Sequence, residues 1–290
     1  MSFLQHAKIR SRQITNADIS KVVELLAKGF PDRNRQYWLN ALERLQRFAT
    51  PAGYPKYGYL MEDDGALVGV KLMIFSKVRP DNDFVRCNVS SWFVEPQFRS
   101  HATFLVSKVL NHKGVTFLNI SPASHVRPII EAQGFVRYSS GQFVTLPTIR
   151  RTMHGCRSIK SAAGFIPDVH FDHFERELLS THAEYGCLSL WCITHDRAHP
   201  FVFLPRIVKG FVPCVQLIYC KNTQDFVRFA QPLGLFFASR GRPFIIVDSN
   251  GPINGLTGLY FDGVSPKYFK GQDRPRLGDL AYTEAALFGL

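Results

Sequence analysis

The amino-acid sequence predicts an α/β protein with two domains, each built on a mixed, mostly antiparallel sheet covered by helices. The first observation is length, because 290 residues exceed one ordinary domain. The second is composition: 46% hydrophobic and 20% charged residues supply apolar material for two cores and argue against disorder. The third is the order of apolar patterns. Residues 9–146 predict the order β-α-α-β-β-β-α-β-α-β, and a similar order follows more faintly after residue 160.

The first part of the chain predicts a strand, two helices and a hairpin. Residues 9–14 form the strand, and Thr15 with Asp18 matches a variant of the capping box at a helix start. Residues 57–62 and 66–78 are β-type runs separated by Asp-Asp-Gly, which predicts a β-hairpin. The two helices are indicated by apolar residues at helical spacing: Ile19, Val22, Val23 and Leu26, then Tyr37, Trp38, Leu42, Leu45 and Phe48.

Residues 85–146 continue as strand, helix, strand, helix and strand. A strand at 85–94 precedes a helix that is closed by Lys113-Gly114, a basic last turn and a glycine cap. A buried strand at 115–120 and a short helix at 125–133, stopped by Gly134, lead to strands that reach residue 146. We place the first domain at residues 1–149. The helix after the first strand has its apolar residues on one face: Ala102, Leu105, Val106, Val109 and Leu110.

A second, diverged domain is predicted at residues 161–290, after a basic segment at 150–160 that we interpret as a solvated linker. A helix near Phe174 comes first, and strands follow at 187–194 and 201–220, with a break near Lys209-Gly210. Asn222 or Thr223 is expected to cap a further helix, which Pro232 kinks or ends. A strand at 243–247 and a final apolar segment at 280–288 complete the domain. The repeated order predicts a tandem arrangement.

The charge of the chain favours an anionic partner. The net charge of +12 suits a phosphate-bearing cofactor, a nucleic acid or an acidic membrane. No run approaches the roughly 20 apolar residues of a membrane span, and the N-terminus lacks the apolar region of a secretory signal, so we expect a cytoplasmic protein. The six cysteines are expected to be reduced. Cys192, His195 and His199 have a ligand-like spacing, but without a partner cluster we interpret them as a strand end and a polar turn, and we expect no metal.

One strand–helix junction carries a recognisable motif. Val94-Glu95-Pro96-Gln97-Phe98-Arg99-Ser100-His101-Ala102 resembles the acyl-CoA pyrophosphate loop, V-x-P-x-x-R-G-x-G-x-G/A, of the GCN5-related N-acetyltransferase (GNAT) superfamily. Backbone N–H groups at a helix start hold phosphate oxygens, aided by the helix dipole. The resemblance covers residues 9–146 and extends to Pro128–Phe135, which is similar to a later helix of that family ending in Gly-Phe. It implies acetyl-CoA or another acyl-CoA as co-substrate, bound by Phe93, Val94, Arg99, Ser100, His101, Ala102 and Thr103.

The sequence departs from the family pattern at several positions. Ser100 and Ala102 replace the first two loop glycines, and Phe104, where a third Gly or Ala is usual, is expected to face the core. Ile130 stands where the family often has a tyrosine acid, so the resemblance implies a mechanism without a side-chain acid there. In the second half, Cys220-Lys221-Asn222-Thr223 takes the place of the loop, and we interpret that half as having lost the cofactor site.

The resemblance also implies where catalytic residues lie, because in this fold two central strands splay apart around the acyl group. The candidates at strand ends are Glu95, Asn119, Ser121 and Asp248, with Asn250 beside the last. A carboxylate or a water chain can take the proton of an amine or hydroxyl nucleophile. Each residue also suits a cap or a turn, and 248–251 (Asp-Ser-Asn-Gly) is typical of a turn. Tyr138 is an alternative acid, although strand aromatics more often pack.

Three function classes remain open. The first is an acyl-CoA-dependent N- or O-acyltransferase acting on a small molecule or a peptide. The second is an aminoacyl-tRNA-dependent transferase with tandem GNAT domains, which the net charge of +12 favours and which would make nucleic acid a partner. The third is a non-catalytic GNAT-like binding or assembly protein, favoured by the lost glycines and by Ile130. Hydrolase, zincin, NTPase and Rossmann motifs are missing from the sequence.

Overall fold

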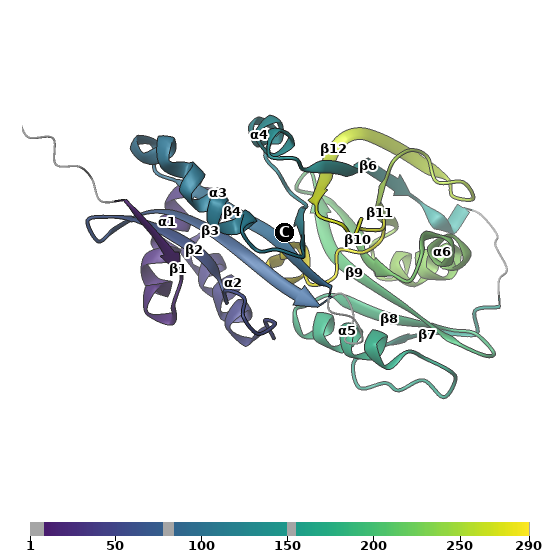
Figure 1. Cartoon of the computed structure of the whole chain (residues 1–290). Coiled ribbons are helices and arrows are strands. Elements are labelled where there is room, and N and C mark those ends of the chain that lie inside the picture. Colours follow the sequence, from purple (N-terminus) through teal and green to yellow (C-terminus); the bar gives the residue numbers. More distant parts are fainter. Residues whose placement is uncertain (1–8, 78–83, 150–154, 290) are drawn as a thin grey trace, which may run out of the picture. The chain divides into compact units, whose positions relative to one another are not determined.

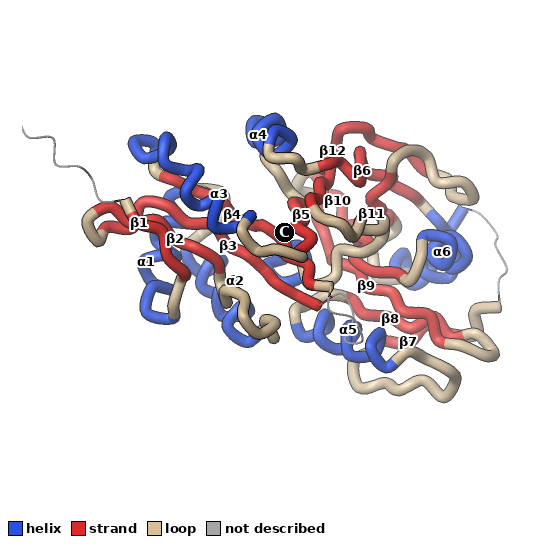
Figure 2. The backbone as a smooth tube through the Cα atoms, in the orientation of Figure 1, coloured by secondary structure: helices blue, strands red, loops and turns tan. Residues whose placement is uncertain are grey.

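The computed structural model describes residues 9–77, 84–149 and 155–289. Helices and strands of the chain are labelled in Figure 1, and Figure 2 colours the same trace by secondary structure. Contacts between Cα atoms divide the chain into two units, one ending at Leu118 and one beginning at Asn119. Residues 150–154 of the predicted basic linker at 150–160 lie outside the described residues. None of the helices among the described residues is long and apolar enough to cross a membrane.

Unit 1 is a sheet of five strands with three helices. The strands lie in chain order, and every neighbouring pair is antiparallel except β4 and β5, which are parallel. The short 3-10 turns η1 and η2, Asn16–Asp18 and Pro96–His101, precede α1 and α3. The elements are β1 Arg10–Gln13, α1 Ile19–Gly29, α2 Arg35–Arg47, β2 Gly58–Asp63, β3 Ala66–Lys77, β4 Val85–Val94, α3 Ala102–Leu110 and β5 Val115–Asn119.

Local sequence signals explain the start of unit 1. Asp18 accepts hydrogen bonds from the backbone N–H and the hydroxyl of Thr15, at 2.8 and 2.7 Å, which confirms the capping box. Arg12 adds two bonds of 2.7 Å to the same carboxylate. This guanidinium is the main reason that the pKa of Asp18 lies well below its usual value. The hairpin prediction is confirmed too, because β2 and β3 are joined at Asp64-Gly65, where both residues have positive φ.

Unit 2 is a sheet of seven strands in the order β12-β6-β11-β10-β9-β8-β7. All neighbouring pairs are antiparallel except β10 and β11. The elements are η3 Ser124–Val126, α4 Arg127–Ala132, β6 Val136–Thr145, η4 Pro147–Ile149, β7 Ser158–Ser161, α5 His173–Glu184, β8 Leu188–Ile193, β9 Ala198–Val208, β10 Val212–Cys220, α6 Thr223–Ala238, β11 Phe244–Ser249, β12 Gly258–Lys270 and a π-helical turn at Ala285–Gly289.

Three segments of the second unit differ from the sequence prediction. Strand β12, for which the sequence predicted no element, pairs with β6 along most of its length. Residues 158–160, assigned to the linker, belong to β7, because Ile159 packs against the core and the segment pairs with β8. Pro232, expected to kink or end its helix, lies inside an uninterrupted α6. Strand β6, placed at the end of the first domain, pairs with β11 and β12 and belongs to the second of the two compact units.

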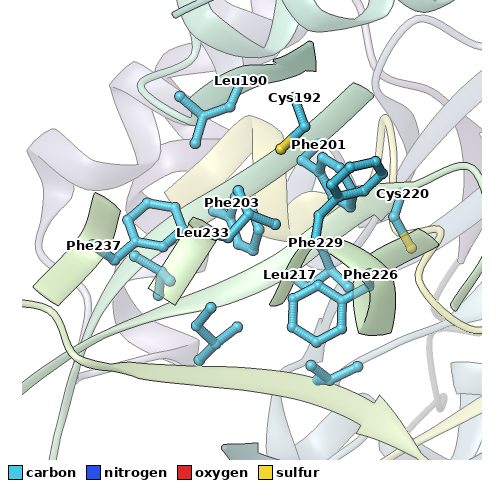
Figure 3. Packing of buried hydrophobic residues seen from close by; sticks show 13 residues of the cluster. Leu190, Cys192, Phe201, Phe203, Leu217, Cys220, Phe226, Phe229, Leu233 and Phe237 are labelled. Atoms are coloured by element: carbon cyan, nitrogen blue, oxygen red, sulfur yellow. The ribbon is translucent and has the colours of Figure 1, made fainter. Parts of the chain in front are cut away.

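An aromatic core holds α6 against the sheet of unit 2. Phe226, Phe229, Leu233 and Phe237 of α6 are fully buried at helical spacing. They pack on Phe201 and Phe203 of β9, as Figure 3 shows. Three cysteines are buried in the neighbouring strands as free thiols: Cys192 in β8, and Cys214 and Cys220 in β10.

Candidate functional site

Strand β4 extends beyond its pairing with its parallel neighbour β5. The pairing joins Val85–Asn88 of β4 to Val115–Leu118 of β5, whereas β4 runs on for six more residues, to Val94. Within this extension, Ser91 is an extra residue in the register with β3 and has a φ of 33°. The bulge bends the strand and changes the direction of the side chains that follow. In unit 1, β4 thus continues as a strand past the residues that it pairs with β5.

The extension of β4 leads directly into the predicted phosphate loop. Pro96–His101 forms the 3-10 turn η2, and α3 begins at Ala102. Arg99, Ser100 and Thr103 are exposed, and His101 and Ala102 are half-buried. The hydroxyl of Ser100 lies 3.1 Å from Nδ1 of His101. The loop thus presents one guanidinium, two hydroxyls and an imidazole at the start of a helix, a set of donors that suits an anion.

Two loop neighbours take positions that the sequence did not predict. Phe104 was expected to face the core, but half of its surface is exposed and its ring stacks on that of His101, with centroids 6.0 Å apart. The apolar face of α3 is supplied by Leu105 and Val109, so Phe104, one position earlier, points outward. Phe93 lies against the end of α1, where a Cβ at Gly29 would come within 2.3 Å of its ring. Gly29 therefore makes the room that Phe93 needs.

Glu95, a predicted catalytic residue, is held by two neighbours. One carboxylate oxygen accepts from Lys28 of α1 at 2.5 Å and the other from Gln97 at 2.9 Å. The backbone N–H of Glu95 donates to Val68. Because both oxygens already accept hydrogen bonds, the contacts of Glu95 are those of a residue that fixes the start of the loop.

Unit 2 contains a second short parallel strand pair, and here another segment of the chain covers the strand beyond the pairing. Cys214–Gln216 of β10 pair with Phe244–Ile246 of β11, and β10 then runs on to Cys220. There the residues Gly278–Leu280, which we call the plug, take the free side of β10. Cys220 N–H donates to Gly278 at 3.0 Å, and Leu280 N–H donates to Ile218 at 2.8 Å. The part of β10 that lies beyond its parallel pairing is therefore covered by another segment of the same chain.

The junction after β10 is closed as well. Asn222 caps α6 by accepting from the N–H of Asp225 at 2.7 Å, and Asp225 places its own carboxylate at the helix start. Arg276 donates to the carbonyl of Cys220. A phosphate placed here would meet the resident carboxylate of Asp225.

Asp248, another predicted catalytic residue, forms a buried ion pair in unit 2. Its carboxylate lies 2.8 Å from the ammonium of Lys267, and both side chains are at least 96% buried. Lys267 comes from β12 and Asp248 from β11, on either side of β6. Gln142 of β6 donates to the same carboxylate at 3.4 Å. Sequence reasoning missed Lys267, because a single lysine in an aromatic stretch gives no signal of a distant acidic partner.

The remaining predicted residues have defined surroundings in unit 2. Asn119 is buried at the end of β5. Ser121 donates from its hydroxyl to Glu284 at 2.5 Å, and Glu284, near the C-terminus, is 3% exposed. Asn250 accepts from the N–H of Ser140 and donates to the carbonyl of Tyr138, so its side-chain amide bonds to the backbone of β6. Glu284 was not predicted, because its segment reads simply as an apolar end.

The structure also places Ile130 and two residues of the ligand-like spacing, Cys192 and His199. Ile130 is buried in α4 and supplies no proton. Cys192 is buried in β8, and His199 of β9 lies 3.7 Å from Asp225. Among the described residues, no three or more His, Cys, Asp and Glu side chains gather as metal ligands would.

The fold can now be compared with known proteins. Neither models of protein families nor curated protein sequences match the chain. Solved structures do: a GCN5-related N-acetyltransferase from Anabaena variabilis aligns over 90% of this chain and 72% of its own, at 8% identity and a TM-score of 0.58. The chain has the GNAT fold. A GNAT protein from Kribbella flavida aligns over 91% and 71% of the two chains, at 13% identity and a TM-score of 0.55.

A third solved structure matches in length as well as in fold. A protein from Pyrococcus horikoshii, described provisionally as an acetyltransferase, aligns over 94% of this chain and 93% of its own. The identity is 13% and the TM-score is 0.55. The GNAT likeness therefore extends over both units, and at such identities it concerns the fold.

Proposed function

We propose that the protein is an acyl-CoA-dependent acyltransferase that uses acetyl-CoA or another acyl-CoA to acylate an amine or a hydroxyl of a small molecule or peptide. The observation that carries the proposal is the extension of β4 beyond its pairing with β5, with a bulge at Ser91 and a basic loop directly after the strand. A GNAT fold with this feature offers an extended backbone edge followed by a phosphate-binding helix start.

Each part of CoA has a candidate partner in unit 1. The pyrophosphate is assigned to Arg99, Ser100, His101, Ala102 and Thr103, where a guanidinium and hydroxyls surround a helix start. The pantetheine arm, which carries amide groups, is assigned to the backbone of Phe93 and Val94, along the extension of β4. Ser100 and Ala102 have small side chains, so the backbone stays accessible at the positions where the family pattern has glycine.

The chemistry requires little from side chains. The nucleophile attacks the thioester carbonyl, the C–S bond breaks, and the thiolate leaves. Because a thiol has a pKa near 8.5, the thiolate departs at neutral pH with water as the later proton donor, and no acid is needed at Ile130. For proton removal we propose the candidates Glu95, Asn119, Ser121 and Asp248. The hydroxyl of Ser121 already donates to the carboxylate of Glu284, a pairing that can pass a proton on.

Calorimetry with CoA and acetyl-CoA, followed by a thiol-release assay on a panel of amines and alcohols, tests the proposal. We expect binding of both ligands and release of free CoA with some acceptors. Binding without turnover on a broad panel would favour a non-catalytic GNAT-like protein. Failure to bind either ligand, with tight and salt-sensitive binding of tRNA, would favour the aminoacyl-tRNA-dependent alternative suggested by the charge of +12.

A further inference from the structure

The hairpin between β9 and β10 in unit 2 ends in an exposed apolar tip. The turn is formed by Lys209 and Gly210, both with positive φ. Ile207 on one side is 69% exposed, and Phe211 on the other is 75% exposed. Val208 is 38% exposed. Large apolar side chains grouped at a protruding turn mark an interaction site more often than single exposed ones do.

The topology of unit 2 places further apolar residues at the same end of the sheet. β11 is parallel to β10 and starts beside Cys214, and β12 runs in the same direction on the far side of β6. The C-terminal turn of α6 and the first residues of β11 and β12 therefore lie at the end from which the hairpin projects. Leu235 in that turn is 55% exposed, and Leu259 at the start of β12 is 68% exposed.

The charges at this end have a single sign. The segments 205–215, 234–244 and 254–260 contain no Asp or Glu and four basic residues: Arg206, Lys209, Arg240 and Arg242. Lys209 and Arg240 are exposed, and Arg206 and Arg242 are half-buried. Arg242 lies near enough to Cys214, at the base of the hairpin, to influence its thiol electrostatically. The apolar tip is thus bordered by cations.

We propose that this end of unit 2 docks on the surface of a membrane that contains anionic phospholipids. The hairpin tip inserts Ile207 and Phe211 among the acyl chains, while Lys209, Arg240 and their neighbours meet the headgroup phosphates. A lipid surface fits the shape better than a protein does. A specific protein interface buries roughly 800 Å² on each partner, which is more surface than a protruding turn provides. A fluid bilayer needs no such preformed matching surface, because its lipids can rearrange around an inserted side chain.

Vesicle co-sedimentation with the full-length protein tests the inference. We expect binding to phosphatidylcholine vesicles that contain phosphatidylglycerol, and at least about tenfold weaker binding to phosphatidylcholine alone, since each surface cation contributes about fivefold. The double variant Ile207→Ser/Phe211→Ser should lose about tenfold or more in affinity for the anionic vesicles. Lys209→Glu/Arg240→Glu should weaken binding at low salt and show little further weakening as salt is added.

Ile166→Ser is the matched control. Ile166 is 62% exposed and follows Ser161, the last residue of β7. The strand register places Ser161 level with Cys220, at the end of β10 that is far from the hairpin tip. This variant should bind vesicles like the wild type, and circular dichroism should show that every variant is folded. Absence of binding to anionic vesicles, or unchanged binding by the Ile207/Phe211 variant, would overturn the inference. Self-association of the wild type that the same variant abolishes would assign the tip to a protein contact instead.

Discussion

The two parallel strand pairs, β4/β5 in unit 1 and β10/β11 in unit 2, start alike and end differently. In each pair a few residues are in register, and the first strand then continues toward a helix. Beyond Asn88, β4 bulges and leads into an exposed loop, whereas beyond Gln216, β10 is covered by the plug Gly278–Leu280. The difference shows how one strand arrangement can lead either into an exposed loop, our proposed ligand site, or into part of a core.

Backbone hydrogen bonding explains why the second pair is closed. A buried strand edge must place its N–H and C=O groups somewhere, and a ligand, water or another segment can satisfy them. In unit 2 the chain supplies that segment itself, with Arg276 on the carbonyl of Cys220 and Asp225 at the start of α6. The comparison therefore predicts that changes near the plug affect stability, and that changes in the loop after β4 affect binding.

The largest effect is expected at the ion pair of unit 2. Lys267→Met leaves the carboxylate of Asp248 buried without its cation, and we expect a loss of about 3–5 kcal/mol in the free energy of unfolding. Urea denaturation followed by circular dichroism measures it. Lys267→Met/Asp248→Asn should recover most of the loss, because no charge is then left unpaired. A single variant that is as stable as the wild type would mean that Asp248 is hydrated or already paired elsewhere.

A somewhat smaller effect is expected from acid, through His182 of α5. Its Nδ1–H donates to Leu178 at 2.7 Å, and its Nε2 accepts from the N–H of Tyr282, two residues past the plug. Burial lowers the pKa of His182 to about 4. Because the unfolded state binds the proton near pH 6.5 and the folded state does not until about pH 4, stability falls across this window on acidification, by about 3 kcal/mol.

The pH profile of a His182→Phe variant isolates this contribution. The variant should be less stable at pH 7, but its stability should fall less steeply between pH 6.5 and 4 than that of the wild type. Burial also lowers the pKa of His112 in unit 1, so part of the acid sensitivity remains in both proteins. If the unfolding free energies of the variant and the wild type fell in parallel with pH, His182 would not be the group that makes stability depend on pH in this window.

The fit of the plug itself is tested by Gly278→Ala. Gly278 has a φ of 74°, and a Cβ there would lie 2.7 Å from Sγ of Cys220. We expect a loss of roughly 1–3 kcal/mol in stability, from the backbone strain and the close contact together. Gly241→Ala is the control for backbone strain alone, because its φ is 73° and nothing lies within 4 Å of the added atom. Equal losses in the two variants would mean that the plug tolerates a side chain.

The smallest effect in free energy, and the one that concerns function, is expected at the loop of unit 1. Arg99→Glu places a negative charge at the proposed pyrophosphate site, so the affinity for CoA measured by calorimetry should fall about tenfold or more. The unfolding free energy should stay within about 0.5 kcal/mol of the wild type, because Arg99 is exposed. Lys108→Glu makes the same charge change further along α3 and should bind CoA normally. Equal affinities of the Arg99 variant and the wild type would refute the assignment of the loop.

Local patterns predicted most of the elements, and non-local pairing accounts for the failures. The capping box at Thr15, the Asp64-Gly65 turn and the cap of α6 at Asn222 each depend on residues a few positions apart, so the sequence alone identified them. Strand β12 was missed, because its exposed and glycine-rich residues lack an apolar alternation and it is a strand only through β6. The predicted phosphate loop does lie between a strand and a helix, although the outward position of Phe104 depended on which face of α3 was buried.

The sequence by itself determined the GNAT-like order of elements, the place of the loop after β4 and the basic charge, because periodicity, turn residues and composition are properties of neighbouring residues. Only the tertiary structure decided that Lys267 pairs with Asp248, that Ser121 donates to Glu284 and that Gly278–Leu280 covers β10. These contacts join residues that are distant in the chain. Burial explains such pairs, because a polar group that is removed from water is costly unless it forms a hydrogen bond or an ion pair with a neighbour in the folded chain.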